Sequence, residues 1–189
     1  ELSRVDPSLG VMVAVHVGLC SMTIALSGNE AQKEKYLPKL ASGEFLGAYS
    51  LSEAGSGTDA AAMVAKATDD GDCYTLNGEK MWVTNGTTAD LFVLFAKVTD
   101  HPDYGKKSHG GVTCFIIEKG FEGFEIGKKE DKLGIRSSDT CTLILNNCKV
   151  PKENVLGEVG KGFPIAMNAL DNSRIGIAAQ GLGIAQGAY

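Results

Sequence analysis

The chain has 189 residues, of which 43% are apolar, and a formal net charge of −5. This composition describes a folded globular protein and argues against a disordered one. The mild acidity comes from 18 Lys and Arg against 23 Asp and Glu. It leaves no basic stripe, so we expect no nucleic-acid partner.

The cysteines and histidines do not form a recognisable metal or disulfide pattern. The cysteines are odd in number, never form a CxxC pair and lie in apolar runs, which indicates a reducing compartment. The histidines are far apart in sequence and have no helical i, i+4 relation, so we expect no metal site. These residues are Cys20, Cys73, Cys114, Cys141, Cys148, His16, His101 and His109.

Residues 1–43 are predicted to form a helical hairpin. Asp6 and Pro7 are a favourable helix start, and Gly28 is a favourable end. The run from Leu9 to Ser27 carries no charge and is long enough to span a bilayer. Glycine and polar residues interrupt it, so we expect a helix buried in a bundle and no membrane partner.

A second helix is predicted after Asn29, because Asn29 and Gln32 have the spacing of a capping box. From Phe45 onward, short β-prone runs alternate with turn residues. Without helices between them, these strands favour an antiparallel sandwich or barrel, so the fold class is α+β. The strands are expected at 47–52, 63–68, 73–83, 91–98, 112–118, 124–127 and 140–150.

After Pro151 the pattern returns to helix, entered at Gly162 to Pro164. This helix reaches Tyr189 with its pattern still running, so we expect an internal fragment of a longer protein. The expected division is 1–43, the end of an N-terminal helical domain; 44–150, a β-domain; and 151–189, the start of a C-terminal helical domain. One stripe of this last helix is expected to be apolar except for Arg174, and it comprises Phe163, Met167, Leu170, Arg174, Ile177, Gly181, Ile184 and Ala188.

Two segments carry the chemistry: YSLSEAGSGTD at 49–59 and MWVTNG at 81–86. Gly55 and Gly57 allow close approach of a ligand, beside hydroxyls that can donate to phosphate or ring oxygens. Trp82 offers a face for stacking, and Thr84 is expected on the same side of the strand. Taken singly, the segments would also fit an ordinary Gly/Ser turn and an Asn-Gly hairpin with a core tryptophan.

In combination the two segments resemble the acyl-CoA dehydrogenase family. YSLSEAGSGTD matches the flavin-binding turn of that family, and GEKMWVTNG its second flavin segment. KKEDKLGIRSSDT and VPKENVLGEVGKGF match its late sheet region, so the resemblance runs colinearly from about residue 10 to Tyr189. Ser52 and Thr58 stand where the family often has Thr and Ser, and Ala54 where it often has Pro.

The resemblance implies noncovalent FAD on the β-domain. The Ser52 hydroxyl would lie near the N1 and O2 edge of the flavin, Thr84 would donate to N5, and Trp82 would pack against the ring. Gly57 and Thr58 would lie by the pyrophosphate and the substrate thioester arm. The implied FAD-binding residues are Tyr49, Leu51, Ser52, Gly57, Thr58, Trp82, Val83 and Thr84.

The resemblance also implies an acyl-CoA substrate bound with help from Thr58, His109, Asp171 and Arg174. From the residues alone, Arg174 would equally suit an ion pair with an acid of a neighbouring helix, and His109 a plain loop position. KLGIRSSDT and LDNSRIGIAAQGLGIAQGA look most like short-chain, butyryl-CoA dehydrogenases, with branched-chain substrates as an alternative.

The implied reaction removes an α-proton with a glutamate and passes the β-hydride to FAD, giving a trans-2-enoyl-CoA in fatty acid β-oxidation. No acid here matches that base, so we expect no catalytic residue in this chain and no turnover by it alone. An electron-transfer flavoprotein, a homotetramer, and the bacterial cytoplasm or the mitochondrial matrix are implied as well. An acyl-CoA oxidase, a flavin monooxygenase of the same fold and a non-catalytic β-barrel binding module are the alternatives.

Overall fold

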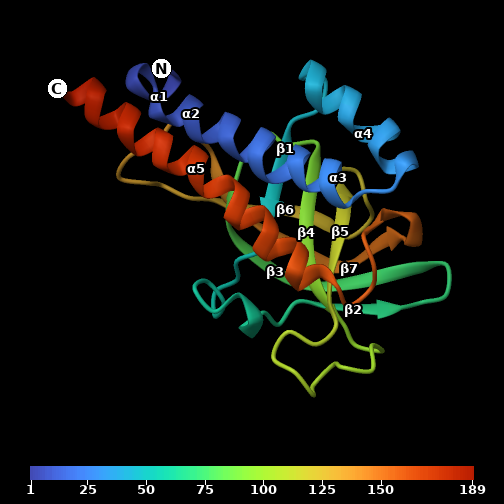
Figure 1. Cartoon of the computed structure of the whole chain (residues 1–189). Helices are drawn as coiled ribbons and strands as arrows, with labels where there is room; N and C mark the ends of the chain where they lie inside the picture. The colour runs from blue at the N-terminus through green and yellow to red at the C-terminus, as the bar shows by residue number, and fades with distance from the viewer.

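A computed structural model describes residues 1–189 as a curved sheet with helices on one face (Figure 1). The helices of residues 2–27 and the last helix, α5 (Gly162–Ala188), lie side by side in opposite directions, which brings the two termini to the same end of the molecule (Figure 1). The side chain of Gln180 joins these two layers, because its amide donates to the carbonyl of Pro7 at 2.9 Å.

In the first helical layer, a helix starts as expected after Asp6, whose carboxylate accepts from the amides of Ser8 and Leu9. The run Pro7–Ser27 is long and apolar enough to cross a membrane by length and composition, a test that the core helix of a soluble protein also passes. Here it packs against α5 and the sheet. The elements of the first helical layer are α1 (Leu2–Val5), α2 (Pro7–Val13), the unexpected π-helical η1 (Ala14–Ser21) and α3 (Met22–Ser27).

Helix α4 (Glu30–Ser42) begins with the expected capping box. Asn29 accepts from the Gln32 amide at 2.9 Å, and the Gln32 side chain accepts from the Asn29 amide at 3.1 Å. The Gln32 side chain also donates to the carbonyls of Glu153 and Val155. The cap therefore starts the helix and fastens it to the far end of the sheet.

All seven expected strands are present, with shifted ends for the first two. The chain leaves the sheet after Ser50, and the second strand starts at Lys66. The last strand was missed because it has only two residues. The strands are β1 (Gly47–Ser50), β2 (Lys66–Asp69), β3 (Cys73–Thr84), β4 (Leu91–Val98), β5 (Val112–Glu118), β6 (Phe124–Lys129), β7 (Thr140–Pro151) and β8 (Val155–Leu156), with short 3-10 turns η2 (Ala60–Ala62) and η3 (Lys152–Asn154).

The strands follow the order β6-β7-β3-β2-β4-β5-β8, with β1 added on β4. Most pairs are antiparallel as expected, but β1 and β2 each run parallel to β4. Parallel pairing needs a long connection. Residues 51–90, which include the β2–β3 hairpin, supply one between β1 and β4.

Strands β4 and β5 are buried on both faces and separate two hydrophobic cores. Phe92 and Leu94 face a core of 19 residues enclosed by the curled sheet, where Phe92 meets Phe124 of β6 with ring centroids 4.8 Å apart. Val93 and Phe95 face a second core of 17 residues, shared with the helices. Alternation along each strand therefore serves both cores.

Only the first part of the apolar stripe expected along α5 (Gly162–Ala188) packs against a core of this chain, through Phe163 and Met167. The buried positions are Gly162, Ala166, Ala169, Gln180 and Gly183, whereas Leu170, Ile177 and Ile184 are exposed. Small residues allow the close approach of the first helical layer. A Cβ on Gly183 would lie 2.8 Å from Ser3 Cβ, and one on Gly187 would lie 2.4 Å from the Arg4 oxygen. Gly183 and Gly187 therefore allow close helix packing, whereas a Cβ on Gly181 would meet no atom within 4 Å.

The capping box predicts a local effect of Asn29→Ala. Losing the cap should cost about 1 kcal/mol of helix stability, so the amides of Gln32 and Lys33 should exchange with solvent about five-fold faster. Hydrogen exchange followed by mass spectrometry measures this. Asn172→Ala, in the exposed middle of α5, is the matched control and should leave α4 exchange unchanged; equal exchange in both variants would contradict the cap.

Candidate functional site

The two signature segments lie side by side. The chain turns away from the sheet after β1, and the amide of Met81 in β3 donates to the carbonyl of Ser52 at 2.9 Å. One residue earlier on each segment, Lys80 Nζ donates to the carbonyl of Leu51 at 3.1 Å. The start of the loop between β1 and β2, residues 51–65, is therefore held along the end of β3. We call residues 51–65 the glycine-rich loop.

A β-bulge turns Trp82 outward. Between the pairs Lys80–Leu143 and Val83–Cys141, β3 advances three residues while β7 advances two. Trp82 takes a left-handed backbone with φ 61° and is 59% exposed, whereas Val83 is buried. A non-glycine residue in this conformation is uncommon and often marks a functional site. Plain alternation did not predict the bulge, although Thr84 is again partly exposed.

The hydroxyl groups on and next to the two signature segments differ in whether they bond within the chain. The hydroxyls of nearby Ser56 and Thr87 bond within the chain, to the Asp59 carbonyl and the Asp139 carboxylate. In contrast, the hydroxyls of Ser52, Thr58 and Thr84 make no hydrogen bond within the chain, and all three residues are at least partly exposed. They remain free to donate to a ligand.

Nothing in the conformation or packing of the chain requires glycine at position 57. A Cβ built on Gly57 or Gly55 would meet no atom within 4 Å, and neither residue has a left-handed φ. The chain thus tolerates a side chain at both positions, whereas a ligand that approaches the backbone closely would not. With an exposed indole and free hydroxyl donors, this set of groups suits a flat ring with a phosphate tail.

Three of the expected FAD-binding residues have side chains inside the protein. Tyr49 packs on Phe95 with ring centroids 5.3 Å apart, and its hydroxyl donates to the Ala166 carbonyl at 3.5 Å. Burial raises the pKa of Tyr49 far above its usual range. Leu51 and Val83 belong to the two cores. Only the backbone of these three residues can face a ligand while these contacts persist.

The expected substrate-binding residues other than Thr58 lie on different elements. His109, in the β4–β5 loop, stacks on Phe163 at the start of α5, with ring centroids 5.1 Å apart. Asp171 and Arg174 lie further along α5 and form an exposed i, i+3 ion pair with each other. Arg174 therefore has an acidic partner on its own helix, and no hydrogen bond joins either residue to the signature segments.

Three buried residues in or next to the segments have roles that the sequence did not reveal. Lys80 and Glu53 form a buried ion pair of 2.6 Å. Asn85, also buried, donates to the carbonyls of Met12 and Gly47 and so ties the second segment to α2 and β1. Alternation from the buried Tyr74 and Leu76 already turns Lys80 inward, ahead of the bulge. Its partner Glu53 is 27 residues away, so the sequence did not reveal the pair.

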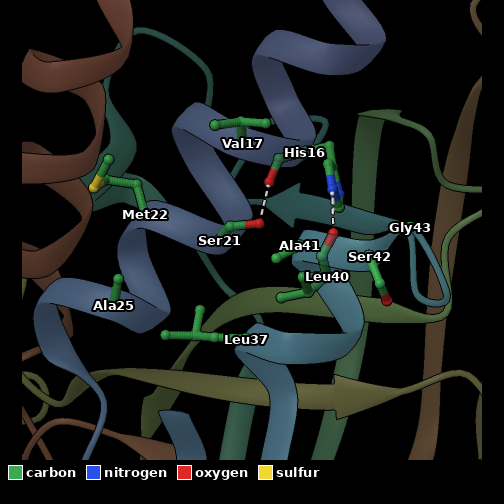
Figure 2. A pocket seen from close by; sticks show the side chains of 10 residues that line it. All are labelled: His16, Val17, Ser21, Met22, Ala25, Leu37, Leu40, Ala41, Ser42 and Gly43. Carbon is green, nitrogen blue, oxygen red and sulfur yellow. Dashed lines mark hydrogen bonds between the residues drawn. The ribbon is translucent and has the colours of Figure 1, made fainter. Parts of the chain in front are cut away.

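A cavity of about 500 Å³ lies between η1, α3 and α4, and none of its lining residues belongs to the signature segments. Figure 2 shows His16 and Ser21 at this cavity, with the His16 ring bonded to the Leu40 carbonyl at 3.1 Å. The other ring nitrogen accepts from the Gly47 amide at 3.0 Å. His16 therefore links the helices to β1, and the cavity is separate from the candidate site.

Family models match nearly all of the sheet and the first helices. The model described as acyl-CoA dehydrogenase, middle domain, matches residues 48–148, and the one described as acyl-CoA dehydrogenase, N-terminal domain, matches residues 1–44. The chain belongs to the acyl-CoA dehydrogenase family.

The short-chain specific acyl-CoA dehydrogenase of Clostridium acetobutylicum is 52% identical over all of this chain and 48% of its own length. The structure of butyryl-CoA dehydrogenase from Megasphaera elsdenii matches with a TM-score of 0.94 and 49% identity over 100% of this chain and 48% of that one. The chain thus spans about half the length of the curated relatives it matches.

Two further structures are informative about ligands and partners of relatives. An acyl-CoA dehydrogenase from Bacillus anthracis complexed with FAD matches with a TM-score of 0.88 and 43% identity, over 96% of this chain and 30% of that one. A structure described as the electron transferring flavoprotein of Acidaminococcus fermentans contains a chain that matches with a TM-score of 0.93 and 49% identity, over 99% of this chain and 48% of that one.

The bulge predicts that two neighbouring substitutions change the unfolding free energy by different amounts. Trp82→Gly relieves a left-handed backbone and removes little buried surface, so the unfolding free energy should change by less than about 1 kcal/mol. Val83→Ala empties a core position and should cost about 2 kcal/mol. Urea denaturation of the ligand-free protein compares them. A larger loss for Trp82→Gly would show that the indole is a core group.

Proposed function

We propose that the natural protein containing this sequence is an FAD-dependent acyl-CoA dehydrogenase that converts a short-chain acyl-CoA to the trans-2-enoyl-CoA. One observation carries the proposal: an exposed indole, uncommitted hydroxyls and an open glycine backbone lie on two segments that are held side by side. Family membership and the names of the short-chain relatives support the same reaction.

In this proposal the two segments hold the flavin. Bound FAD supplies the acceptor for the hydride that leaves the substrate β-carbon. Trp82 stacks against the ring system, and the hydroxyls of Ser52 and Thr84 donate to its polar edge and to N5. Gly57 and Thr58 face the diphosphate and the thioester arm, and Tyr49, Leu51 and Val83 contribute through their backbones. Fixed donors of this kind stabilise charge that develops during a reaction.

The acyl-CoA is proposed to contact Thr58, His109, Asp171 and Arg174. The stack of His109 on Phe163 links the β4–β5 loop to α5, so a ligand along this loop would also meet the helix. Arg174 would have to exchange its exposed contact with Asp171 for the substrate. Such an exposed ion pair contributes little stability, so that exchange costs little.

The remaining parts of the proposal concern the whole protein. Residues 1–43, 44–150 and 151–189 belong to an N-terminal helical, an FAD-binding β and a C-terminal helical domain. No catalytic base is assigned within this chain, because Glu53 is committed to Lys80. An electron-transfer flavoprotein as acceptor, a homotetramer, and a role in β-oxidation in the bacterial cytoplasm complete the proposal, with the mitochondrial matrix as the alternative location.

A direct assay tests this function. The purified natural protein should show a flavin absorption band, release FAD on denaturation, and bleach on anaerobic addition of butyryl-CoA. Reduction of an added electron-transfer flavoprotein, without oxygen consumption, is the expected turnover. Oxygen consumption would instead identify an oxidase or a monooxygenase, and a protein without flavin would fit a non-catalytic binding module.

Thr84→Val should slow flavin reduction about 100-fold, because removing one donor to a developing charge typically has that effect. Stopped-flow measurement at saturating butyryl-CoA gives the rate of the reductive step. Thr68→Val, on the exposed side of β2, is the matched control and should retain the parent rate. An unchanged rate in Thr84→Val would remove this residue from the proposed site.

A further inference from the structure

The side chain of Lys80 is completely buried, and only 4% of the Glu53 side chain is exposed. Nζ of Lys80 and Oε1 of Glu53 are 2.6 Å apart. Burial lowers the pKa of Lys80, and the attraction and hydrogen bond of Glu53 oppose that shift. The pair adjoins the candidate site, because Lys80 is two residues before Trp82 and Glu53 directly follows Ser52.

The pair holds both ends of the glycine-rich loop. At the first end, Lys80 donates to the Leu51 carbonyl at 3.1 Å. At the second end, Glu53 accepts from the Val64 amide at 2.6 Å and from the Ala65 amide at 3.2 Å. Residues 51, 53, 64, 65 and 80 thus form one connected network.

The loop has no regular strand pairing of its own, although Met63 is buried in the core and Lys97 donates to the Ala61 carbonyl at 2.9 Å. Gly55, Gly57, Thr58 and Asp59 are exposed, and only the short turn η2 interrupts the irregular backbone between Ser50 and Lys66. Glu53 and Ser56 exchange backbone hydrogen bonds across its tip. At the end of the loop, the carboxylate of Glu53 therefore accepts from backbone amides that would otherwise need a partner on a neighbouring strand.

A role in stability alone explains the pair poorly. Burying two charges carries a desolvation penalty, and an apolar pair of similar volume often gives an equally stable protein. An apolar pair could not accept two backbone amides and donate to a carbonyl at defined positions. The charged pair is therefore needed to hold these backbone groups at defined positions.

Direct chemistry by either residue is also a poor explanation. Both oxygens of Glu53 are occupied by Lys80 and by backbone amides. The Lys80 amine is completely buried and already donates to two acceptors. Neither group is presented to a substrate.

We propose that Lys80, acting through Glu53, is a positioning residue that fixes Ser52 and the glycine-rich loop against Trp82, and so sets how tightly the protein holds the reduced flavin. The inference rests on the proposed function, because it concerns the same cofactor. Ser52 is the donor expected at the flavin edge that gains charge on reduction, so a displaced loop should weaken the reduced form more than the oxidised form.

The test uses the natural holoenzyme with Lys80→Met, Lys80→Arg, Glu53→Gln and the double variant Lys80→Met with Glu53→Gln, which buries no charge. In Lys80→Met and in the double variant, the affinity for reduced relative to oxidised FAD should fall about tenfold, which is a potential about 30 mV more negative for a two-electron couple. Lys80→Arg should recover part of this shift. In the ligand-free protein, the amides of Val64 and Ala65 should exchange faster.

Asn154→Ala is the matched control, because Asn154 is buried and bonds to Tyr36 and the Ile116 carbonyl, away from both segments. It should lower thermal stability without moving the potential. Unchanged potential and FAD affinity in a folded Lys80→Met or double variant would overturn the inference, as would failure of every variant to fold, which would assign the pair to folding alone. A parent protein without FAD would instead overturn the proposed function itself.

Discussion

The double burial of β4 and β5 is the constraint on which the rest of the structure depends. Both faces of these strands carry large apolar side chains, so the sheet must curl over one face and recruit helices onto the other. Phe92 and Phe115 meet rings from β6 and β3 inside the curled sheet. Tyr49 and Phe95 meet the helices on the opposite side. Because β1 is paired with β4 up to Ser50, the chain leaves the sheet at that residue, and the glycine-rich loop starts there.

The buried ion pair follows from this arrangement. Where the chain leaves β1, the backbone groups of residues 51–65 lose their strand partners, and unpaired buried amides are costly. Glu53 satisfies two of them, and Lys80 neutralises the carboxylate that does so. Removing one partner of such a pair typically costs about 3–5 kcal/mol, because the other charge remains buried without compensation. The loop, its carboxylate and the lysine on β3 form an interdependent unit.

Much of this fold could be predicted from the sequence, because strand alternation, turn residues and the Asn29 capping box are local features. The errors have non-local causes. The stripe assigned to α5 followed its large apolar residues, whereas the contact with the first helical layer is made at the glycines 183 and 187. The outward turn of Trp82 depends on a bulge against β7, which only strand pairing reveals. Of the candidate site residues, Trp82 was singled out for its chemistry, whereas the direction of Tyr49 depended on a partner, Ala166, far away in the sequence.

The candidate site gathers features that cost stability in the chain itself. Trp82 combines a left-handed backbone with an exposed indole. Lys80 is a buried charge. Gly57 makes the backbone more flexible, although a side chain at this position would meet no other atom. Local rules of stability are met at the Asn29 cap and along most of the strands, whereas several of them are broken together here. Natural proteins concentrate such departures where a ligand or a reaction requires them. The clustering of these costs on two adjoining segments is thus an argument for a binding site that is independent of family membership.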